Sequence, residues 1–397
     1  MNQRECALEI IHKTISDSSY TNLLMRKKLE ELPKIRRPFV TALVNGVLKE
    51  YDFLLYQFKD SIDPKTSLKN KIIIAMALYE RFFLGEKEYA VNNEYVELAH
   101  GKYDRSFINA VLRNTGELVK SEDGYINESL PEWLYKLLDR QYDEEDFRKI
   151  LANYKRTPKL YYRINHKKAK FTDFEKIEVI SDDVFTCEEN LLASPYMKDG
   201  FFYVQDLNSA GLYKHLDLKE DDRLLDVCSA PGSKLFNCLD IIKPENAYAN
   251  DLHEHRLKLI KDKAEVLGFE GINYLCHDGC DLKDILDVRF DKIMLDAPCS
   301  GLGTIGRRPD LRYHISPSSL DELEEIQRRL LDSVGGLLKE KGILLYSTCT
   351  LNKKENGRQI ERFLKDNKNF RLIEEETIIN EEGDCFYYAG LLKEYNE

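Results

Sequence analysis

Two cysteines stand where they could act together as reactive groups. Cys299 closes the segment LDAPC, and Cys349 lies in the segment YSTCT. Each segment opens with an apolar run that is typical of a buried parallel strand. Because the carboxyl ends of parallel strands line the ligand crevice of an open α/β sheet, we expect both thiols to face one site. A thiolate is a strong nucleophile, so the pattern predicts covalent chemistry on an electrophilic ring.

A third segment, LLDVCSAPGSK, reads as a strand that runs into a tight turn and then a helix. Gly232 lets the backbone of this turn approach a ligand closely, and the helix presents its N-terminus there. Asp251 follows 19 residues after Gly232, the place where such folds hold a ribose diol. Asp278 ends the next strand and is placed for an adenine amine. Each aspartate could instead cap a helix. An acidic ribose clamp without a phosphate-binding glycine series favours S-adenosylmethionine over a nicotinamide dinucleotide.

The remaining cysteines point to packing in a reducing compartment. The chain has nine cysteines, no CxxC pair and no apolar segment near its start that reads as a secretory signal, so we expect reduced thiols and a cytoplasmic protein. Cys276 and Cys280 flank His277, but no further ligands follow at zinc spacing, so no metal is expected. The longest apolar run, Ile72 to Tyr79, is too short to span a membrane.

Net charge is −11 and the isoelectric point about 5.4, so contact with a polyanion must come from local basic patches. One basic stretch, residues 152–170, contains no acidic residue and is interleaved with tyrosines that could stack on bases. A second lies close to Cys299, where its alternative role is to pair with acidic neighbours. The candidate RNA-binding residues of the two stretches are Lys155, Arg156, Arg163 and Lys167, and Arg307, Arg308 and Arg312.

The elements that must position these groups change character along the chain. Residues 1–125 show helical periodicity throughout, which predicts an all-α bundle. Residues 126–205 combine helices with short strands and predict linker helices and a small α+β module. Residues 206–397 alternate strands with helices, the pattern of a doubly wound, mainly parallel sheet. The predicted fold class is therefore a multidomain α and α/β protein.

In their order, these motifs resemble those of the Sun/NOL/NOP family of RNA cytosine-C5 methyltransferases, and within it the bacterial 16S rRNA enzymes of the Sun or Fmu type (the cytosine-967 type). The resemblance covers essentially the whole chain. The segments that carry it are QDLNSAG, DVCSAPGSK, LDAPCSG, RRPDLR, YSTCT with Glu355 and Asn356, and EEGDCFYYAGLLK. It implies a NusB-like RNA-binding domain at 1–125, a small RNA-binding module at 126–205, and a Rossmann-like methyltransferase domain at 206–397.

The resemblance also implies roles for single residues. Cys349 is the implied nucleophile, and Cys299 assists release of the product. Asp296 faces the methyl donor and the target base, and Lys234 helps to order the pocket. Asp251 holds the ribose and Asp278 the adenine side of S-adenosylmethionine. The implied cofactor loop consists of Cys228, Ser229, Ala230, Pro231, Gly232, Ser233 and Lys234.

The implied reaction explains why two thiols and a carboxyl group are needed. C5 of cytosine is a poor nucleophile, and addition of a thiolate to C6 makes it enamine-like. A carboxyl group held neutral, with Asp296 as the candidate, could support this addition by hydrogen bonding at N3. The target base must leave its stack to reach the thiolate. The implied substrate is 16S rRNA, free or in an assembling particle, and the protein is expected to be a monomer with no membrane partner.

Two departures and two alternative functions accompany this resemblance. Ser229 and Ser233 replace an alanine and a glycine of the family loop, and Ser233 would be strained if its φ were positive. Gly306 stands where an arginine is common. One alternative function is a non-catalytic, antitermination-like RNA-binding factor in which the N-terminal bundle dominates. The other keeps the chemistry but acts on tRNA or another rRNA site.

Overall fold

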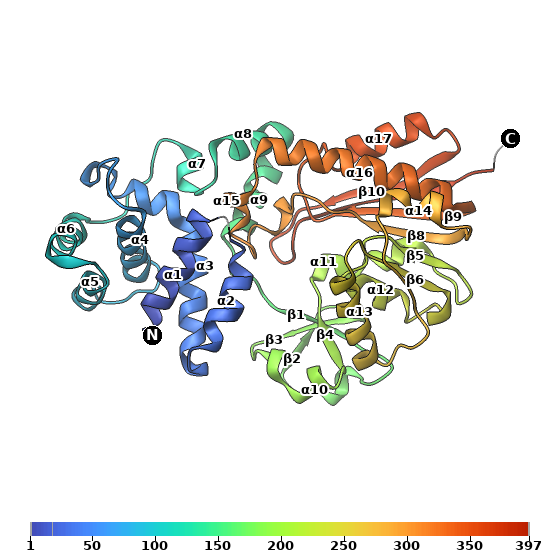
Figure 1. Ribbon diagram of the computed structural model, residues 1–397, viewed down its shortest axis with the longest axis horizontal. Coiled ribbons are helices and arrows are strands. Elements are labelled where there is room, and N and C mark those ends of the chain that lie inside the picture. The colour runs from blue at the N-terminus through green and yellow to red at the C-terminus, as the bar shows by residue number, and fades with distance from the viewer. Residues whose placement is uncertain (1, 18, 396–397) are drawn as a thin grey trace. The chain divides into compact units, whose positions relative to one another are not determined.

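The computed structural model describes residues 2–17 and 19–395. The chain divides into two compact units (Figure 1). The first comprises residues 1–155 together with residues 305–315, and the second comprises residues 156–304 and 316–397. The short segment 305–315 therefore belongs to the first unit, although in the sequence it lies between two parts of the second.

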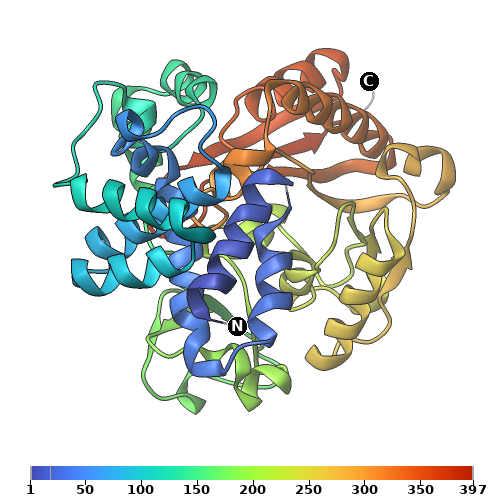
Figure 2. The same cartoon turned by 60° about the vertical axis from the view of Figure 1, so that its left-hand side comes forward.

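The first unit is a bundle of helices, seen from the side in Figure 2. Helix α4 lies at its centre, and seven consecutive residues from Ile72 to Leu78 are at most 1% exposed. Its neighbours are amphipathic, and they bury one face each against it. The helices are α1 (Gln3–Ser16), α2 (Thr21–Glu30), α3 (Arg37–Tyr56), α4 (Leu68–Phe82), α5 (Glu88–Glu97), α6 (Gly101–Asn114), α7 (Gly124–Asn127), α8 (Glu132–Gln141), α9 (Glu144–Lys155) and α15 (Leu311–His314).

Helices α7 to α9, which the sequence placed in a middle module, fall within the first unit. Polar contacts explain this grouping: the backbone NH of Phe53 on α3 donates to the Ser129 hydroxyl at 2.9 Å. The Lys155 ammonium at the end of α9 bonds Glu50 on α3 at 2.5 Å. The boundaries at 125 and 205 remain predictions about domains, whereas the compact units meet in sequence at residue 155.

The second unit contains a seven-stranded sheet in the order β10-β11-β9-β8-β5-β6-β7. Strands β5 to β9 run parallel, and β10 and β11 add an antiparallel edge. The strands are β5 (Leu224–Asp226), β6 (Ala247–Asn250), β7 (Asn273–Leu275), β8 (Phe290–Asp296), β9 (Leu338–Thr348), β10 (Phe370–Ile378) and β11 (Phe386–Lys393).

Helices cover both faces of this sheet, as Figure 1 shows. One core packs α12 (Ser233–Cys238) and α13 (Glu254–Leu267) on one face through residues such as Phe236 and Ile260. The other core packs α16 (Pro317–Leu337) and α17 (Gly357–Asp366) on the opposite face through Leu331 and Phe363. This doubly wound arrangement confirms the predicted fold class.

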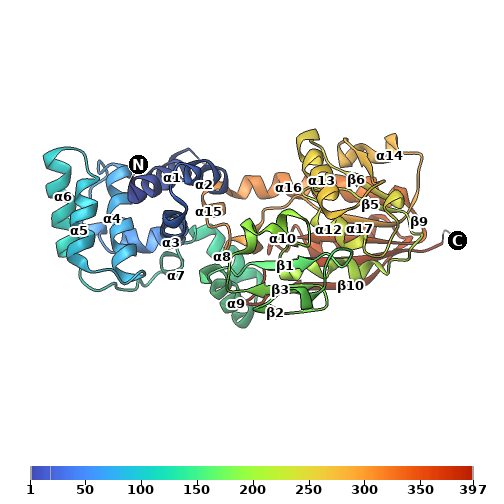
Figure 3. The same cartoon turned by 90° about the horizontal axis from the view of Figure 1, so that it is seen from below.

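A second, smaller sheet with the order β2-β3-β1-β4 belongs to the same unit and is seen in Figure 3. Its strands are β1 (Tyr161–Ile164), β2 (Ile177–Val179), β3 (Val184–Cys187) and β4 (Phe202–Val204), all antiparallel. Its core consists of aromatic rings, among them Tyr162, Phe185 and Phe202. The Asn165 amide bonds the carbonyl of Leu267 on α13 at 2.9 Å and so attaches this sheet to the larger one.

Strand β10 carries a run of three glutamates, Glu374 to Glu376, and pairs with β11 at the edge of the sheet. Helix α16 ends at Leu337, and β9 begins at Leu338. No helix in the described part of the chain is long and apolar enough to cross a membrane.

Candidate active site

The site lies where the direction of the winding changes. The chain passes from β5 outward to β6 and β7, and then returns to β8 on the other side of β5. Ligand crevices in open sheets form outside the carboxyl ends of strands at such a point. Asp226 ends β5 and Asp296 ends β8, so their loops define the two sides of the crevice.

The two predicted thiols meet at this point. The Cys299 and Cys349 sulfur atoms are 3.4 Å apart, within hydrogen-bonding range for thiols. Parallel pairing of Asp296 with Ser347 brings the ends of β8 and β9 together, and the two cysteines follow in the adjoining loops. The contact with Cys349, together with burial, raises the pKa of the Cys299 thiol well above its ordinary value. Burial and the neighbouring sulfur therefore disfavour the thiolate form of Cys299, and one proton can bridge the two sulfur atoms.

A charged triad lies next to the thiols. The Lys234 ammonium donates to Asp296 at 2.6 Å, and the Ser347 hydroxyl donates to the other oxygen of Asp296 at 2.9 Å. Burial alone would lower the pKa of Lys234, but the adjacent carboxylate raises it above its usual value. Asp296 therefore has a proton donor within one hydrogen bond, and the expectation that its carboxyl group is held neutral stays a prediction.

A buried carboxylate that carried no assigned role holds both cysteine loops in place. Glu355 is 0% exposed. Its carboxylate accepts from the backbone NH of Ser300 at 2.8 Å and from the Ser300 hydroxyl at 2.6 Å. Ser300 directly follows Cys299, and its hydroxyl also bonds Thr350, which directly follows Cys349. One carboxylate therefore fixes the chain beside each thiol.

The same carboxylate is further held by amide side chains. Gln327 on α16 donates to Glu355 at 3.0 Å and to the Pro298 carbonyl at 2.9 Å. Asn352 donates to Glu355 at 3.2 Å. In the sequence, this group was indicated by Glu355 and Asn356, which closely follow YSTCT. Nothing in the sequence pointed to Gln327, because it lies on α16, far from both cysteine segments.

The cofactor-type loop has the close-fitting geometry that its motif suggests. Gly232 has a φ of 92°, and a side-chain carbon there would lie 2.9 Å from the Phe236 ring and 3.1 Å from Ile260. Ser233 begins helix α12 and is not among the residues with positive φ, so the substitution causes no strain. Asp251 is 2% exposed and accepts from the backbone NH of Ala230 at 3.3 Å, which ties β6 to this loop.

Asp278 caps a helix, the alternative considered for it, and its role at the adenine side stays a prediction. One of its oxygens accepts from the backbone NH of Cys280 at 2.9 Å, so it caps the short helix that follows. Its side chain is half-buried, so capping leaves part of the carboxylate accessible. Cys228, the first residue of the loop, is enclosed by packing that raises its pKa far above the ordinary value. It is therefore an inert thiol.

The sequence also missed a buried acid, Asp226. This residue is 1% exposed, and neither of its oxygens makes a hydrogen bond within the described residues. Burial raises its pKa to about 7, a shift that the nearby Ser229 hydroxyl partly offsets. A buried carboxylate without a partner is costly, and its place beside the loop suits a cationic ligand.

The candidate RNA-binding residues are less available than the sequence indicated. Arg163 is 1% exposed and pairs with Asp183 at 3.0 Å and with Asp240 at 2.8 Å. Arg156 donates to the Glu382 carbonyl at 2.7 Å. Lys155 is paired as described above, and Lys167 stays exposed with its ammonium 4.1 Å from the Phe269 ring centre. The tyrosines of the same stretch, Tyr154, Tyr161 and Tyr162, are at most 3% exposed, so stacking of bases on them is excluded.

The three arginines of the second basic stretch also differ in exposure. Arg312 is 4% exposed and donates to the carbonyls of Lys49 and Ser129, each at 2.8 Å. It serves packing in the helical unit. Arg308 is half-buried and lies 3.9 Å from Asp310, whereas Arg307 is exposed. The structure explains why a glycine stands at position 306. A side-chain carbon there would lie 2.5 Å from the Asn153 carbonyl oxygen.

This doubly wound sheet, with a close-fitting cofactor-type loop and two adjacent thiols, defines a methyltransferase fold with a cysteine-bearing site. Comparisons with known proteins agree. A family model described as 16S rRNA methyltransferase RsmB/F matches residues 213–389, and a NusB family model matches residues 1–117. The probable ribosomal RNA small subunit methyltransferase B of Bacillus subtilis (strain 168) is 32% identical, with 92% of this chain and 89% of that protein covered.

The corresponding protein of Enterobacter sp. (strain 638) is 28% identical over 99% of both chains. The chain therefore belongs to the ribosomal RNA small subunit methyltransferase B family, and it is an rRNA methyltransferase. The resemblance seen in its motifs is confirmed.

Solved structures support the fold independently. PH0851 superimposes with a TM-score of 0.78 over 99% of each chain at 20% sequence identity. The structure of NSun6 from Pyrococcus horikoshii with SFG has a TM-score of 0.58 and covers 67% of this chain and 99% of its own, at 19% identity. At these identities the likeness establishes the fold alone.

Proposed function

We propose that the protein transfers a methyl group from S-adenosylmethionine to C5 of a cytosine in 16S rRNA through a covalent bond between Cys349 and C6. The observation that carries this proposal is the 3.4 Å contact of Cys299 with Cys349 beside the Lys234–Asp296 pair. Two thiols and a proton-bearing pair in one crevice are what addition to a pyrimidine and its reversal require. This arrangement also disfavours a purely RNA-binding, antitermination-like role.

S-adenosylmethionine supplies a methyl group on a positively charged sulfur. The Gly232 turn and Asp251 would hold it, with Asp278 at the adenine side, and the unpartnered Asp226 would compensate positive charge. The relative with SFG and the family membership support this choice.

The chain's own groups then act in order on the base. The Cys349 thiolate adds to C6, and as negative charge develops at N3 a proton passes to it from Lys234 through Asp296. The electron pair moves to C5, which becomes nucleophilic. After C5 has gained the methyl group, a base removes the C5 proton, the C6–sulfur bond breaks, and the N3 proton returns through Asp296 to Lys234. The Cys299 thiol can donate a hydrogen bond to the departing Cys349 thiolate.

The test measures transfer of a labelled methyl group from S-adenosylmethionine to unmethylated 16S rRNA, with bisulfite sequencing to locate the product. We expect a single cytosine to be methylated, and the resemblance points to cytosine-967. Cys349→Ala is expected to abolish transfer, and Cys187→Ala, which alters a free thiol at the end of β3 in the small sheet, is the matched control. Unchanged activity of Cys349→Ala would defeat the assignment. Methylation of tRNA or of another rRNA site would keep the chemistry and change the substrate.

We further propose a cytoplasmic location, since the implied substrate is found there. Binding of the RNA is expected to involve the exposed Lys167 and Arg307 rather than the buried arginines of the two stretches.

A further inference from the structure

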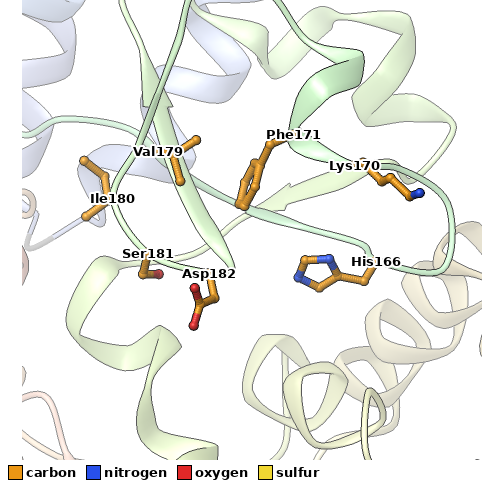
Figure 4. A pocket seen from close by; sticks show the side chains of 7 residues that line it. All are labelled: His166, Lys170, Phe171, Val179, Ile180, Ser181 and Asp182. Carbon is orange, nitrogen blue, oxygen red and sulfur yellow. The ribbon is translucent and has the colours of Figure 1, made fainter.

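The small sheet carries a hollow that the catalytic crevice does not use. Its volume is about 480 Å³, within the range of roughly 300–1,000 Å³ that is typical of small-molecule sites. Figure 4 shows the side chains around it. They are His166, Lys170, Phe171, Val179, Ile180, Ser181 and Asp182.

Three short segments build this hollow, and each is held in place. His166 follows β1, Phe171 begins a short 3-10 helix, and residues 180–182 form the turn between β2 and β3. The turn is closed by the backbone NH groups of Ile180 and Ser181, which donate to the Val184 carbonyl at 2.8 and 3.1 Å. The hollow therefore exists without a ligand.

A buried acid orients the histidine. His166 bonds Asp183 at 3.1 Å, and Asp183 also accepts from Tyr213 at 2.8 Å and pairs with Arg163. Burial alone would raise the pKa of Asp183, but Arg163 and these hydrogen bonds hold it below its ordinary value. The charged Asp183 thus fixes the imidazole at the rim.

The lining has the mixed chemistry that a nucleotide needs. Phe171 rests edge-on against Phe185 in the core, with ring centres 6.1 Å apart, and reaches the hollow from there. Val179 is 51% exposed and adds an apolar wall. Within the described residues, neither the Lys170 ammonium nor the Asp182 carboxylate has a partner. The site offers one ring for stacking, one cation for a phosphate and one acceptor for an amino group.

The charged groups that line the hollow are of both signs. His166 and Lys170 are exposed there together with Asp182, whereas the ammonium groups of Lys167 and Lys168 contact Phe269 and the carbonyls of Asp199 and Val266. The buried tyrosines of residues 152–170 cannot stack on bases, whereas the ring of Phe171, which directly follows this stretch, borders the hollow. A carboxylate among cations suits a ligand that combines a phosphate with a base bearing an exocyclic amino group.

We propose that this hollow binds one nucleotide of single-stranded RNA, with its base on Phe171, its amino edge at Asp182 and its phosphate at Lys170 and His166. The proposal rests on the proposed function, because it assigns a second contact to the same rRNA outside the catalytic crevice. Base stacking on an aromatic ring tolerates many sequences, whereas Asp182 favours the bases with an exocyclic amino group, adenine, cytosine and guanine, over uracil.

Fluorescence anisotropy with labelled hexa-adenylate and hexa-uridylate tests the proposal on the full chain. Adenylate avoids competition from the pocket for the target cytosine. Phe171→Leu keeps an apolar side chain but removes the ring, and it is expected to weaken hexa-adenylate binding about tenfold. Tyr196→Leu removes an exposed ring of the same module that lies outside the hollow, and it should bind like the unaltered protein. Asp182→Asn should reduce the preference for adenylate over uridylate, and Glu178→Gln is its control.

Ultraviolet crosslinking of the unaltered protein to hexa-adenylate supplies a measurement that needs no variant. The adduct is expected within residues 166–182, and adducts found only elsewhere would overturn the proposal. A folded Phe171→Leu protein with unchanged affinity would do the same. If the unaltered protein methylates 16S rRNA while either of these results holds, only the nucleotide site is refuted. If no rRNA is methylated but binding depends on Phe171, the proposed function fails and the nucleotide site stands.

Discussion

At the scale of single residues, the two thiols of the crevice are unequal. Burial and the contact with Cys349 raise the pKa of the Cys299 thiol, and in the proposed function Cys349 is the attacking group. Cys299→Ala should therefore still form the bond to C6 but release the product slowly. Denaturing gel electrophoresis of the variant with rRNA and S-adenosylmethionine should show a protein–RNA adduct that the unaltered protein does not accumulate. An adduct in Cys349→Ala instead would exchange the two roles.

Asp226 gives a pH-dependent prediction at the same scale. Its folded-state pKa is about 7 against an ordinary value of 3.8, so the folded protein holds a proton that the unfolded chain has lost. Raising the pH from about 4 to about 7 must then cost stability, and above about 7 the loss is complete, on the order of 4 kcal/mol.

Asp226→Asn removes this titration. The free energy of unfolding of this variant, measured by urea denaturation, is compared with that of the unaltered protein. The difference, variant minus unaltered, should increase from pH 5 to pH 8. A constant difference across this interval would show that Asp226 is not buried as an uncompensated acid.

At the scale of elements, Glu355 connects two loops that no single strand could hold together. It binds the residue after Cys299, and through Ser300 it reaches the residue after Cys349. Glu355→Gln places an amide where two donors point, so the loops should shift. We expect kcat to fall about 100-fold with little change in KM for rRNA, since RNA binding does not involve this buried group. Glu361→Gln, an exposed change on α17, is the control. A rise in KM as large as the fall in kcat would argue against a positioning role.

The elements also show what the sequence could predict and what it could not. The apolar runs that end at Asp296 and Thr348 were readable as parallel strands, and with them the meeting of the two thiols. The role of Gln327 could not be predicted, because the sequence around a glutamine on an amphipathic helix does not show which loop its side chain contacts. Arg163 and Arg312 were misjudged for a related reason. Their positive charge suggested phosphate contacts, but charge alone does not reveal that a carboxylate or a pair of carbonyls will bury it.

At the scale of the whole molecule, the path of the chain makes one unit depend on a segment from the middle of the other unit's sequence. Residues 305–315 lie between β8 and α16, yet they pack in the helical unit. There Tyr313 donates to the Leu48 carbonyl at 2.9 Å, and Arg312 bonds the Lys49 and Ser129 carbonyls. Truncating the Arg312 side chain would remove the hydrogen bonds that both carbonyls accept from it.

We therefore expect Arg312→Ala to destabilise the helical unit by about 3 kcal/mol, although residue 312 is remote from it in sequence. The only tryptophan of the chain, Trp133, lies on α8 in that unit, so its fluorescence reports this unfolding directly. The midpoint of the urea transition followed by Trp133 should fall in Arg312→Ala. It should change little in Arg308→Ala, whose guanidinium is half-buried and lies 3.9 Å from Asp310. Equal midpoints for the two variants would mean that the segment adds no stability to the helices. A selective loss would mean that an insertion between two strands of the methyltransferase sheet is part of the core of the helical unit.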